Sequence, residues 1–348
     1  MRNALISLIF IVVALSGCNR FNYDVKDNLR PVYIAAKTDL SISTKSPYNG
    51  TTTPTVSAPL KSIVCVSTDN MYFRPDGPNG TSEGGEISKH IHVEFQSSQG
   101  QSLNDIYYNK DFIQDVYFTA VYPELEWNFS GDFSSVSTTF DGSKDIMFAP
   151  QVIGRYVADE PDQKKENQIP TLNFKHMLTY LKVEVGAAGK DVIESEAISQ
   201  AWGKIRSMTI SCQNSISINL ADGTANFTGE KGEMNFYKPN SDVVFPGTDG
   251  YVIPSTSTAA AYVLCSPVMA TNDDPDFPYE YAITLETDNR HVVIDIDLKN
   301  AADAYFSGNT AGYQFTIGLN FKMGNNIAVS AKIDSWETGG IGTGSIQQ

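Results

Sequence analysis

Histidines are the side chains of this sequence best suited to chemistry, because they bind metal ions and transfer protons near neutral pH. Four are present, at His90, His92, His176 and His291. His90 and His92 lie two residues apart in a strand-like run, so their rings point to the same side and could share one metal ion. The sequence names no third ligand beside them. We therefore interpret the pair as part of a solvated strand face.

Oxygen ligands gather in the run 272–276, Asn-Asp-Asp-Pro-Asp. Pro275 and the lack of a later bidentate Glu at loop spacing break the EF-hand pattern, so an acidic turn is predicted in place of a calcium site. The sequence contains no H-E-x-x-H pair, Walker loop or G-x-G-x-x-G fingerprint. Neither an enzymatic activity nor a metal or other cofactor is predicted.

Three tryptophans, Trp127, Trp202 and Trp336, have flat aromatic faces that suit a sugar ring. Core packing is the preferred interpretation, because aromatic side chains are mostly used for burial. A solvent-facing row of tryptophans favours a glycan-binding protein. Buried tryptophans favour a structural one.

The first residues have the pattern of a bacterial export signal. Arg2 supplies a positive start, and residues 4–15 form an apolar stretch too short to cross a membrane as a mature helix. Leu15-Ser16-Gly17-Cys18 follows and resembles the lipobox of bacterial lipoproteins, in which the cysteine is acylated before cleavage. We therefore predict a signal peptide over residues 1–17 and acyl chains, such as palmitate, on Cys18 that anchor the mature protein in the outer membrane.

Three further cysteines lie at Cys65, Cys212 and Cys265. An odd number cannot be fully paired within one chain, and each lies in an apolar, strand-like setting. Buried free thiols are preferred over a disulfide or a metal site, although the sequence does not settle the pairing.

Composition excludes several classes of protein. The 25 Lys+Arg and 40 Asp+Glu give a formal net charge of −15, so nucleic acid is not an expected partner. Apolar residues make up 41% of the chain, and 17 Tyr and 18 Phe supply bulky contacts for a globular core. Abundant Ser and Thr favour strands and turns over long helices.

Alternating apolar residues predict many short strands separated by turns, which is typical of antiparallel sandwiches. We divide the mature chain near residue 165, where the run 159–167 has no apolar residue to bury, into domains 18–165 and 166–348. Residues 191–206 are the best helical candidate, with helix or loop left open. The predicted strands are 32–36, 62–66, 90–95, 116–122, 181–185, 208–210, 216–220, 261–264, 281–285, 292–298, 313–319 and 327–333.

Four segments in this order resemble the fimbrillin family of Bacteroidetes, whose members build type V pili. They are 116–123 ending in Ala-Val-Tyr-Pro, 145–149 (Asp-Ile-Met-Phe-Ala), 172–178 (Leu-Asn-Phe-Lys-His-Met-Leu) and 327–336 ending in Asp-Ser-Trp. The resemblance implies an all-β fold of two transthyretin-like antiparallel β-sandwich domains in tandem with few short helices. It also implies a lipoprotein of the cell surface that joins other pilin subunits by strand exchange.

The resemblance also implies proteolytic activation. In the family, a trypsin-like protease removes the first strand, and a strand from the next subunit fills the groove that is opened. Here residues 32–42 would be the removable strand, and Lys45 is the basic residue just beyond it, where the family more often has Arg. Arg30 is a poorer candidate because a proline follows it, and Lys37 lies inside the strand. The alternative to proteolytic processing is that residues 45–50 form an ordinary turn.

The last residues point to a particular place in a fibre. Residues 337–348 contain four glycines and only two large apolar side chains, Ile341 and Ile346, so they would make a poor donor strand. We therefore predict a pilus subunit that accepts a strand better than it donates one, such as a tip or accessory subunit that binds host or bacterial surfaces. The strand ending at Ile333 is the alternative donor. The alternative function is a surface glycan-binding lipoprotein.

Overall fold

Strands dominate this computed structural model, which confirms the all-β prediction. Among the described residues, α2 (Val192–Trp202) is the helix, and it is neither long nor apolar enough to cross a membrane. The described residues are 29–38, 60–67, 89–95, 101–109, 114–131, 134–156, 170–239, 241–268, 280–297, 310–324 and 326–334.

A seven-stranded sheet contains the amino-terminal strands. Its order is β3 (Lys89–Phe95), β2 (Leu60–Ser67), β5 (Gln114–Tyr122), β8 (Met147–Tyr156), β9 (Thr171–His176), β1 (Leu29–Thr38) and β4 (Gln101–Asn109). Neighbours are antiparallel except for β1 and β9, which run parallel. Alternation along β5 places Val116, Phe118 and Ala120 in one core cluster, while Val121 joins a second cluster on the opposite face.

Two four-stranded sheets contain most of the carboxyl-terminal strands. One has the order β15 (Thr258–Cys265), β10 (Thr179–Ala187), β18 (Gln314–Phe321) and β19 (Ile327–Asp334). The other has the order β14 (Gly232–Asn235), β11 (Ile205–Cys212), β16 (Glu280–Thr287) and β17 (His291–Asp297). Val183 and Ile317 from the first sheet and Ile210 and Ile283 from the second are fully buried in the larger core cluster. The alternation of apolar and polar residues along these strands therefore determines which face of each sheet packs against the core.

A fourth sheet joins strands that are distant in the sequence. Its order is β13 (Ala225–Thr228), β12 (Ser215–Asn219), β7 (Ser135–Thr139) and β6 (Asn128–Phe129). The boundary near residue 165 lies outside the described residues and stays a prediction. Strand pairing crosses that position three times, because β1 and β8 both pair with β9 and β7 pairs with β12.

The helical candidate 191–206 contains the helix α2 followed by the start of β11. Asp191 is the N-cap, and its carboxylate accepts a hydrogen bond from the backbone N–H of Glu194 at 2.8 Å. The Glu194 carboxylate accepts in turn from the N–H of Lys190 at 2.8 Å. Gly203, with a φ of 74°, ends the helix, so the apolar Ile205 belongs to the next strand.

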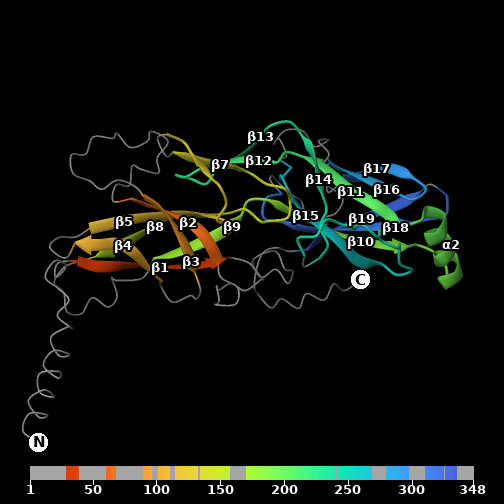
Figure 1. Ribbon diagram of the computed structural model, residues 1–348, viewed down its shortest axis with the longest axis horizontal. Helices are drawn as coiled ribbons and strands as arrows, with labels where there is room; N and C mark the ends of the chain where they lie inside the picture. The colour runs from red at the N-terminus through yellow and green to blue at the C-terminus, as the bar shows by residue number, and fades with distance from the viewer. Residues whose placement is uncertain are drawn as a thin grey trace, which may run out of the picture.

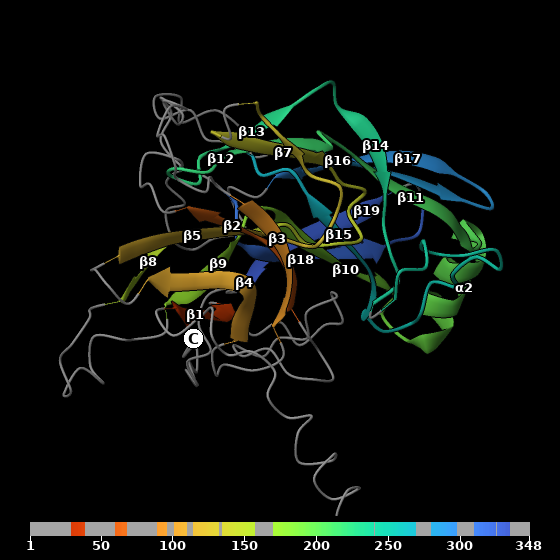
Figure 2. The same cartoon turned by 60° about the vertical axis from the view of Figure 1, so that its left-hand side comes forward.

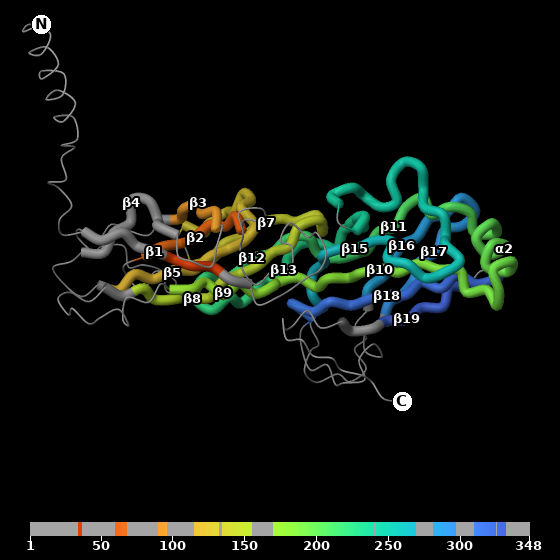
Figure 3. Tube along the Cα trace, turned by 90° about the horizontal axis from the view of Figure 1, so that it is seen from below, coloured from red at the N-terminus to blue at the C-terminus, as the bar shows by residue number. Residues whose placement is uncertain are grey.

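The molecule is elongated, with the seven-stranded sheet at one end and α2 at the other (Figure 1). The strands run largely along the long axis, as the view from below also shows (Figure 3). The sheet of β13, β12 and β7 lies along the upper side, whereas β1 lies along the lower side (Figures 1 and 2).

Candidate functional site

The first strand of the structure, β1, is an internal strand of its sheet. Residues Ala35 to Thr38 pair in parallel with Thr171 to Phe174 of β9, and the N–H of Ala35 donates to the carbonyl of Pro170 at 2.9 Å. The other edge of β1 pairs with β4, from Leu29 opposite Asn109 to Ile34 opposite Gln101. Both backbone edges of β1 therefore take part in ladders.

Side chains of β1 are part of the core. Ile34, Ala35 and Ala36 are 0%, 4% and 1% exposed. Ile34 and Ala36 belong to the same buried cluster as Leu172 and Phe174 of β9. Removal of β1 would therefore uncover an apolar strip together with the unpaired backbone edges of β9 and β4, which is the kind of groove that a new strand fills.

Two of the four segments that carried the resemblance meet beside β1. Met147 and Phe148 of β8 pair with His176 and Lys175 of β9, and the N–H of Met177 donates to the carbonyl of Ile146 at 2.8 Å. Segments 145–149 and 172–178 thus form one continuous piece of sheet. Their order in the sequence gives no direct sign of this pairing.

A buried polar pair joins the same two segments. Nδ1 of His176 contacts Oδ2 of Asp145, and the two side chains are 5% and 2% exposed. The second carboxylate oxygen of Asp145 is buried without a hydrogen-bond partner among the described residues. Because a buried polar pair is costly to separate, this contact holds the loop before β8 against the end of β9.

Two predicted sites lie outside the described residues. They are the lipidation site Cys18 and the processing site Lys45. The described chain stops at Thr38 of β1 and resumes at Leu60 of β2, so Lys45 belongs to the connection between these strands. Both sites stay predictions.

Within the described part of the chain, the last strand, β19, lies at the edge of its sheet and pairs with β18 alone. Val329 is 39% exposed, and Ser330 beside it is also exposed. Ile327 and Ala331 are partly buried against the core. One backbone edge of β19 thus has no neighbouring strand among the described residues. The Gly-rich segment after it, like Trp336, lies outside them.

The histidines of β3 are exposed, which confirms the interpretation as a solvated strand face. The ring of His90 stacks on Phe129 with centroids 4.6 Å apart, and Nδ1 of His92 lies 2.7 Å from the carboxylate of Glu124. His291 forms another surface pair, with Glu286 at 3.5 Å. Within the described residues, no group of three His, Cys, Asp or Glu side chains could hold a metal ion. The acidic run 272–276 lies outside them.

The three cysteines are free and buried, in agreement with their interpretation as core residues. Burial raises the pKa of Cys65 to about 12 and that of Cys212 to about 11, and it also raises the pKa of Cys265. These thiols are therefore protonated at neutral pH and cannot act as nucleophiles.

Two of the three tryptophans are core residues, as preferred from the sequence. Trp202 is fully buried, donates from Nε1 to the carbonyl of Lys322 at 2.9 Å, and has the guanidinium of Arg290 4.1 Å above its ring. Trp127 is 8% exposed and donates to the carbonyl of Pro123 at 2.9 Å. Neither ring can act as an open platform for a sugar.

The sequence reasoning missed two parts of the site. The run 101–109 was not predicted as a strand, yet it forms β4, the antiparallel partner of β1. It also missed the polar outer face of the fourth sheet. The alternation Ser-Val-Ser-Thr-Thr at 135–139 and Ser-Ile-Ser-Ile-Asn at 215–219 is the signal that would have found this face.

Comparison with known proteins agrees with this architecture. A candidate cell adhesion protein from Bacteroides uniformis is 17% identical, with a TM-score of 0.50 over 88% of this chain and 99% of its own. Another from Bacteroides ovatus is 14% identical, with a TM-score of 0.53 over 89% of this chain and 99% of its own. A search of the curated proteins found no match. The fimbrillin-like family model matches residues 76–336, which is most of the chain, and the protein therefore belongs to the fimbrillin-like family.

Proposed function

We propose that this protein is a pilus subunit that accepts a strand from a neighbouring subunit in the place of β1. The family is one of fimbrial and adhesion proteins of the cell surface, not of enzymes. The observation that carries the proposal is the position of β1, an internal strand near the amino terminus with buried side chains and neighbours on both edges. Export as an outer-membrane lipoprotein through Cys18 and cleavage after Lys45 complete the proposal.

The position of β1 explains why replacement is favourable. β4 is an edge strand whose neighbour in the sheet is β1, so loss of β1 exposes two backbone edges at once. The buried positions of Ile34 and Ala36 would become open to water. An incoming strand recovers both the ladder hydrogen bonds and the apolar burial, and the groove therefore selects another strand over solvent.

Limited trypsin digestion of the full chain tests the processing step. We expect a stable fragment that begins at Ser46, identified by amino-terminal sequencing and mass spectrometry. Lys45→Gln should prevent this cut, while Lys45→Arg should preserve it, because trypsin accepts both basic side chains. Resistance of the wild-type chain at this position, or complete digestion without a stable core, would contradict the proposal.

A resemblance between β1 and β19 favours a second role, in which the chain also donates a strand. β1 reads Val-Tyr-Ile-Ala-Ala-Lys over 32–37, and β19 reads Ile-Ala-Val-Ser-Ala-Lys over 327–332. In both strands a branched apolar residue, Ile34 or Val329, is followed by two small residues and a lysine. The narrow site left by Ala35 and Ala36 admits only small side chains at those positions. β19 meets that requirement.

A peptide covering residues 324–348 tests donation. Mixed with trypsin-trimmed protein, it should be incorporated and remain bound during gel filtration. A peptide with Ala331→Trp is the control, because an indole does not fit where Ala36 lies, and it should not bind. Failure of the wild-type peptide to bind would leave the chain as an acceptor alone, which is the tip or accessory role predicted from its Gly-rich end.

A further inference from the structure

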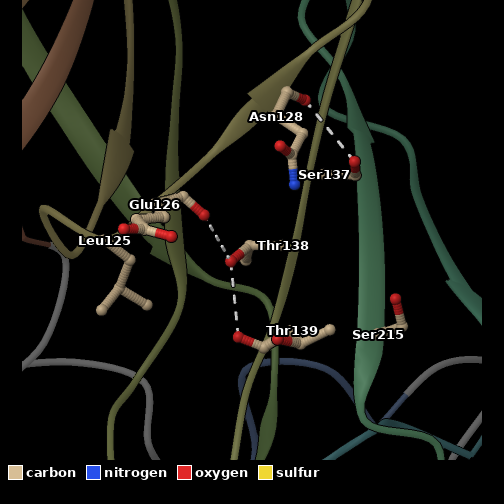
Figure 4. Close-up of a pocket in the computed structure, with 7 residues that line it drawn as sticks. All are labelled: Leu125, Glu126, Asn128, Ser137, Thr138, Thr139 and Ser215. Atoms are coloured by element: carbon tan, nitrogen blue, oxygen red, sulfur yellow. Dashed lines mark hydrogen bonds between the residues drawn. The ribbon is translucent and has the colours of Figure 1, made fainter.

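A polar cavity lies on the fourth sheet, beside the segment that leads into β6. Its volume is about 420 Å³, and it is open to solvent. Figure 4 shows Leu125 and Glu126 on one side, Thr138 and Thr139 in the middle, and Ser215 on the other side. The volume is typical of sites that hold small ligands, which span roughly 300–1,000 Å³.

Polar groups in this cavity are available to a ligand. The Thr138 hydroxyl donates to the carbonyl of Glu126 at 3.0 Å and is already engaged. In the described part of the chain, the side chains of Glu126, Asn128, Thr139 and Ser215 have no hydrogen-bond partner. Together they offer carboxylate and amide acceptors, amide donors and two hydroxyls that can do both.

The charge of the lining limits the class of ligand. Among the described residues, Glu126 is the one charged residue that lines the cavity, so an anion would meet repulsion with no compensating cation from that part of the chain. A calcium ion needs six to eight oxygen ligands and is held by several carboxylates, and this cavity supplies one. A neutral molecule with many hydroxyl groups matches the donors and acceptors. Leu125 adds an apolar contact for its C–H groups.

The surrounding surface extends the same chemistry. Ser137 pairs across the ladder with Ser217 on one side and with Asn128 on the other, and Ser217 pairs with Asn226. These side chains share the outer face, because Val136, Ile216 and Ile218 alternate with them toward the core. The cavity thus opens onto a row of neutral hydroxyl and amide groups, within a protein of net charge −15.

We propose that this cavity and the adjoining sheet face bind a neutral glycan. The sheet of β13, β12 and β7 lies on the upper side of the molecule, whereas β1 lies on the lower side (Figures 1 and 2). Strand replacement at β1 would therefore leave the cavity open in a fibre. Trp127 and Trp202 are buried, so neither ring can stack on a sugar. Binding at this site would depend on hydrogen bonds instead.

Ligand-observed NMR titration of the full, uncleaved chain in mild detergent tests this site. The probes are cellohexaose, mannohexaose and laminarihexaose, with sialyllactose as the anionic probe and calcium chloride as the cation. We expect at least one neutral hexasaccharide to bind with a Kd of about 1 mM, since the contacts replace hydrogen bonds to water. The double variant Glu126→Gln/Asn128→Ala should weaken this binding about 10-fold or more.

Asn235→Ala is the matched control, because Asn235 is exposed on β14, in another sheet, and lies outside both the cavity and the adjoining sheet face. It should bind as the wild type does, and circular dichroism should show the same unfolding temperature for all variants. Absence of binding to the neutral probes, equal loss in the control, preference for sialyllactose, or calcium binding that depends on Glu126 would each overturn the proposal. Because the uncleaved chain is used, none of these outcomes depends on strand exchange.

Discussion

Gly142 and Gly229 both have a positive φ, +89° and +90°, but their surroundings differ. A Cβ at Gly142 would lie 2.8 Å from side-chain atoms of Met234 and Val263, whereas a Cβ at Gly229 would meet no atom within 4 Å. In both alanine variants, the left-handed backbone should lower the free energy of unfolding by about 1–2 kcal/mol. Gly142→Ala should lose a further ~1–3 kcal/mol through overpacking. Urea unfolding measures the stability of both variants. Equal losses would contradict the close packing around Gly142.

The buried thiols predict a protection experiment. Burial raises the pKa of Cys65 to about 12 and that of Cys212 to about 11, so little thiolate forms in the folded protein at pH 8. In a Cys18→Ser variant, iodoacetamide should label neither thiol, nor Cys265, within minutes under native conditions. All three should react in 8 M urea, as intact-mass spectrometry would show. Rapid labelling of one thiol in the native protein would contradict its burial.

The same shifts predict a loss of stability at high pH. The folded protein keeps the Cys65 proton between its ordinary pKa of 9.0 and about 12, whereas the unfolded chain releases it. The unfolded state therefore binds fewer protons in this window, and stability falls as the pH rises through it. The raised pKa of Tyr262, caused chiefly by burial, acts in the same direction. The urea midpoint should fall between pH 9 and pH 10.5, and a constant midpoint would contradict this.

The sequence predicted which side chains are buried better than it predicted which side chains contact one another. The apolar neighbours of Cys65 and the alternation around His90 and His92 were sufficient to predict a buried thiol and two exposed rings. The contact of Asp145 with His176 was not predictable, because it depends on how β8 pairs with β9. The cavity residues were missed because Ser, Thr and Asn are common on any solvated strand.

At the scale of elements, the cap of α2 is a local device with a measurable contribution. Replacing Asp191 by Ala removes the acceptor for the N–H of Glu194 and should cost about 1 kcal/mol, whereas Asp191→Asn keeps an acceptor and should cost less. Urea unfolding at neutral pH would show the difference. Equal losses for the two variants would mean that the charge, not the hydrogen bond, stabilises the helix end.

Strands with strong alternation were predicted, and polar strands were not. The run 116–122 lies within β5, and 292–298 largely coincides with β17. The missed strands are β4, β6, β7, β8, β13 and β14. Most of them are short or polar and form through pairing, whereas β8 is apolar but lacks strict alternation. The parallel pairing of β1 with β9 joins segments far apart in sequence. Local periodicity carries no information about such a contact.

At the scale of the whole molecule, net charge should control the rate of assembly. Trimmed subunits that begin at Ser46 contain 19 Lys+Arg and 37 Asp+Glu, so each carries a charge of −18 and repels the others. The range of this repulsion falls from about 30 Å at 0.01 M salt to about 8 Å at 0.15 M. Strand exchange between trimmed subunits should therefore speed up several-fold over this range. Gel electrophoresis of the products over time measures the rate, with sucrose of equal osmolarity as the control. A rate that falls with salt would contradict the prediction.

The direction of β1 determines how a fibre would carry mechanical load. β1 runs along the long axis of an elongated molecule and is paired on both edges (Figure 1). A strand in that position would be pulled along its own length when the fibre is stretched. Its ladder hydrogen bonds would then be loaded together in shear instead of opening one after another. We expect such a joint to resist tension far better than a joint peeled from one end.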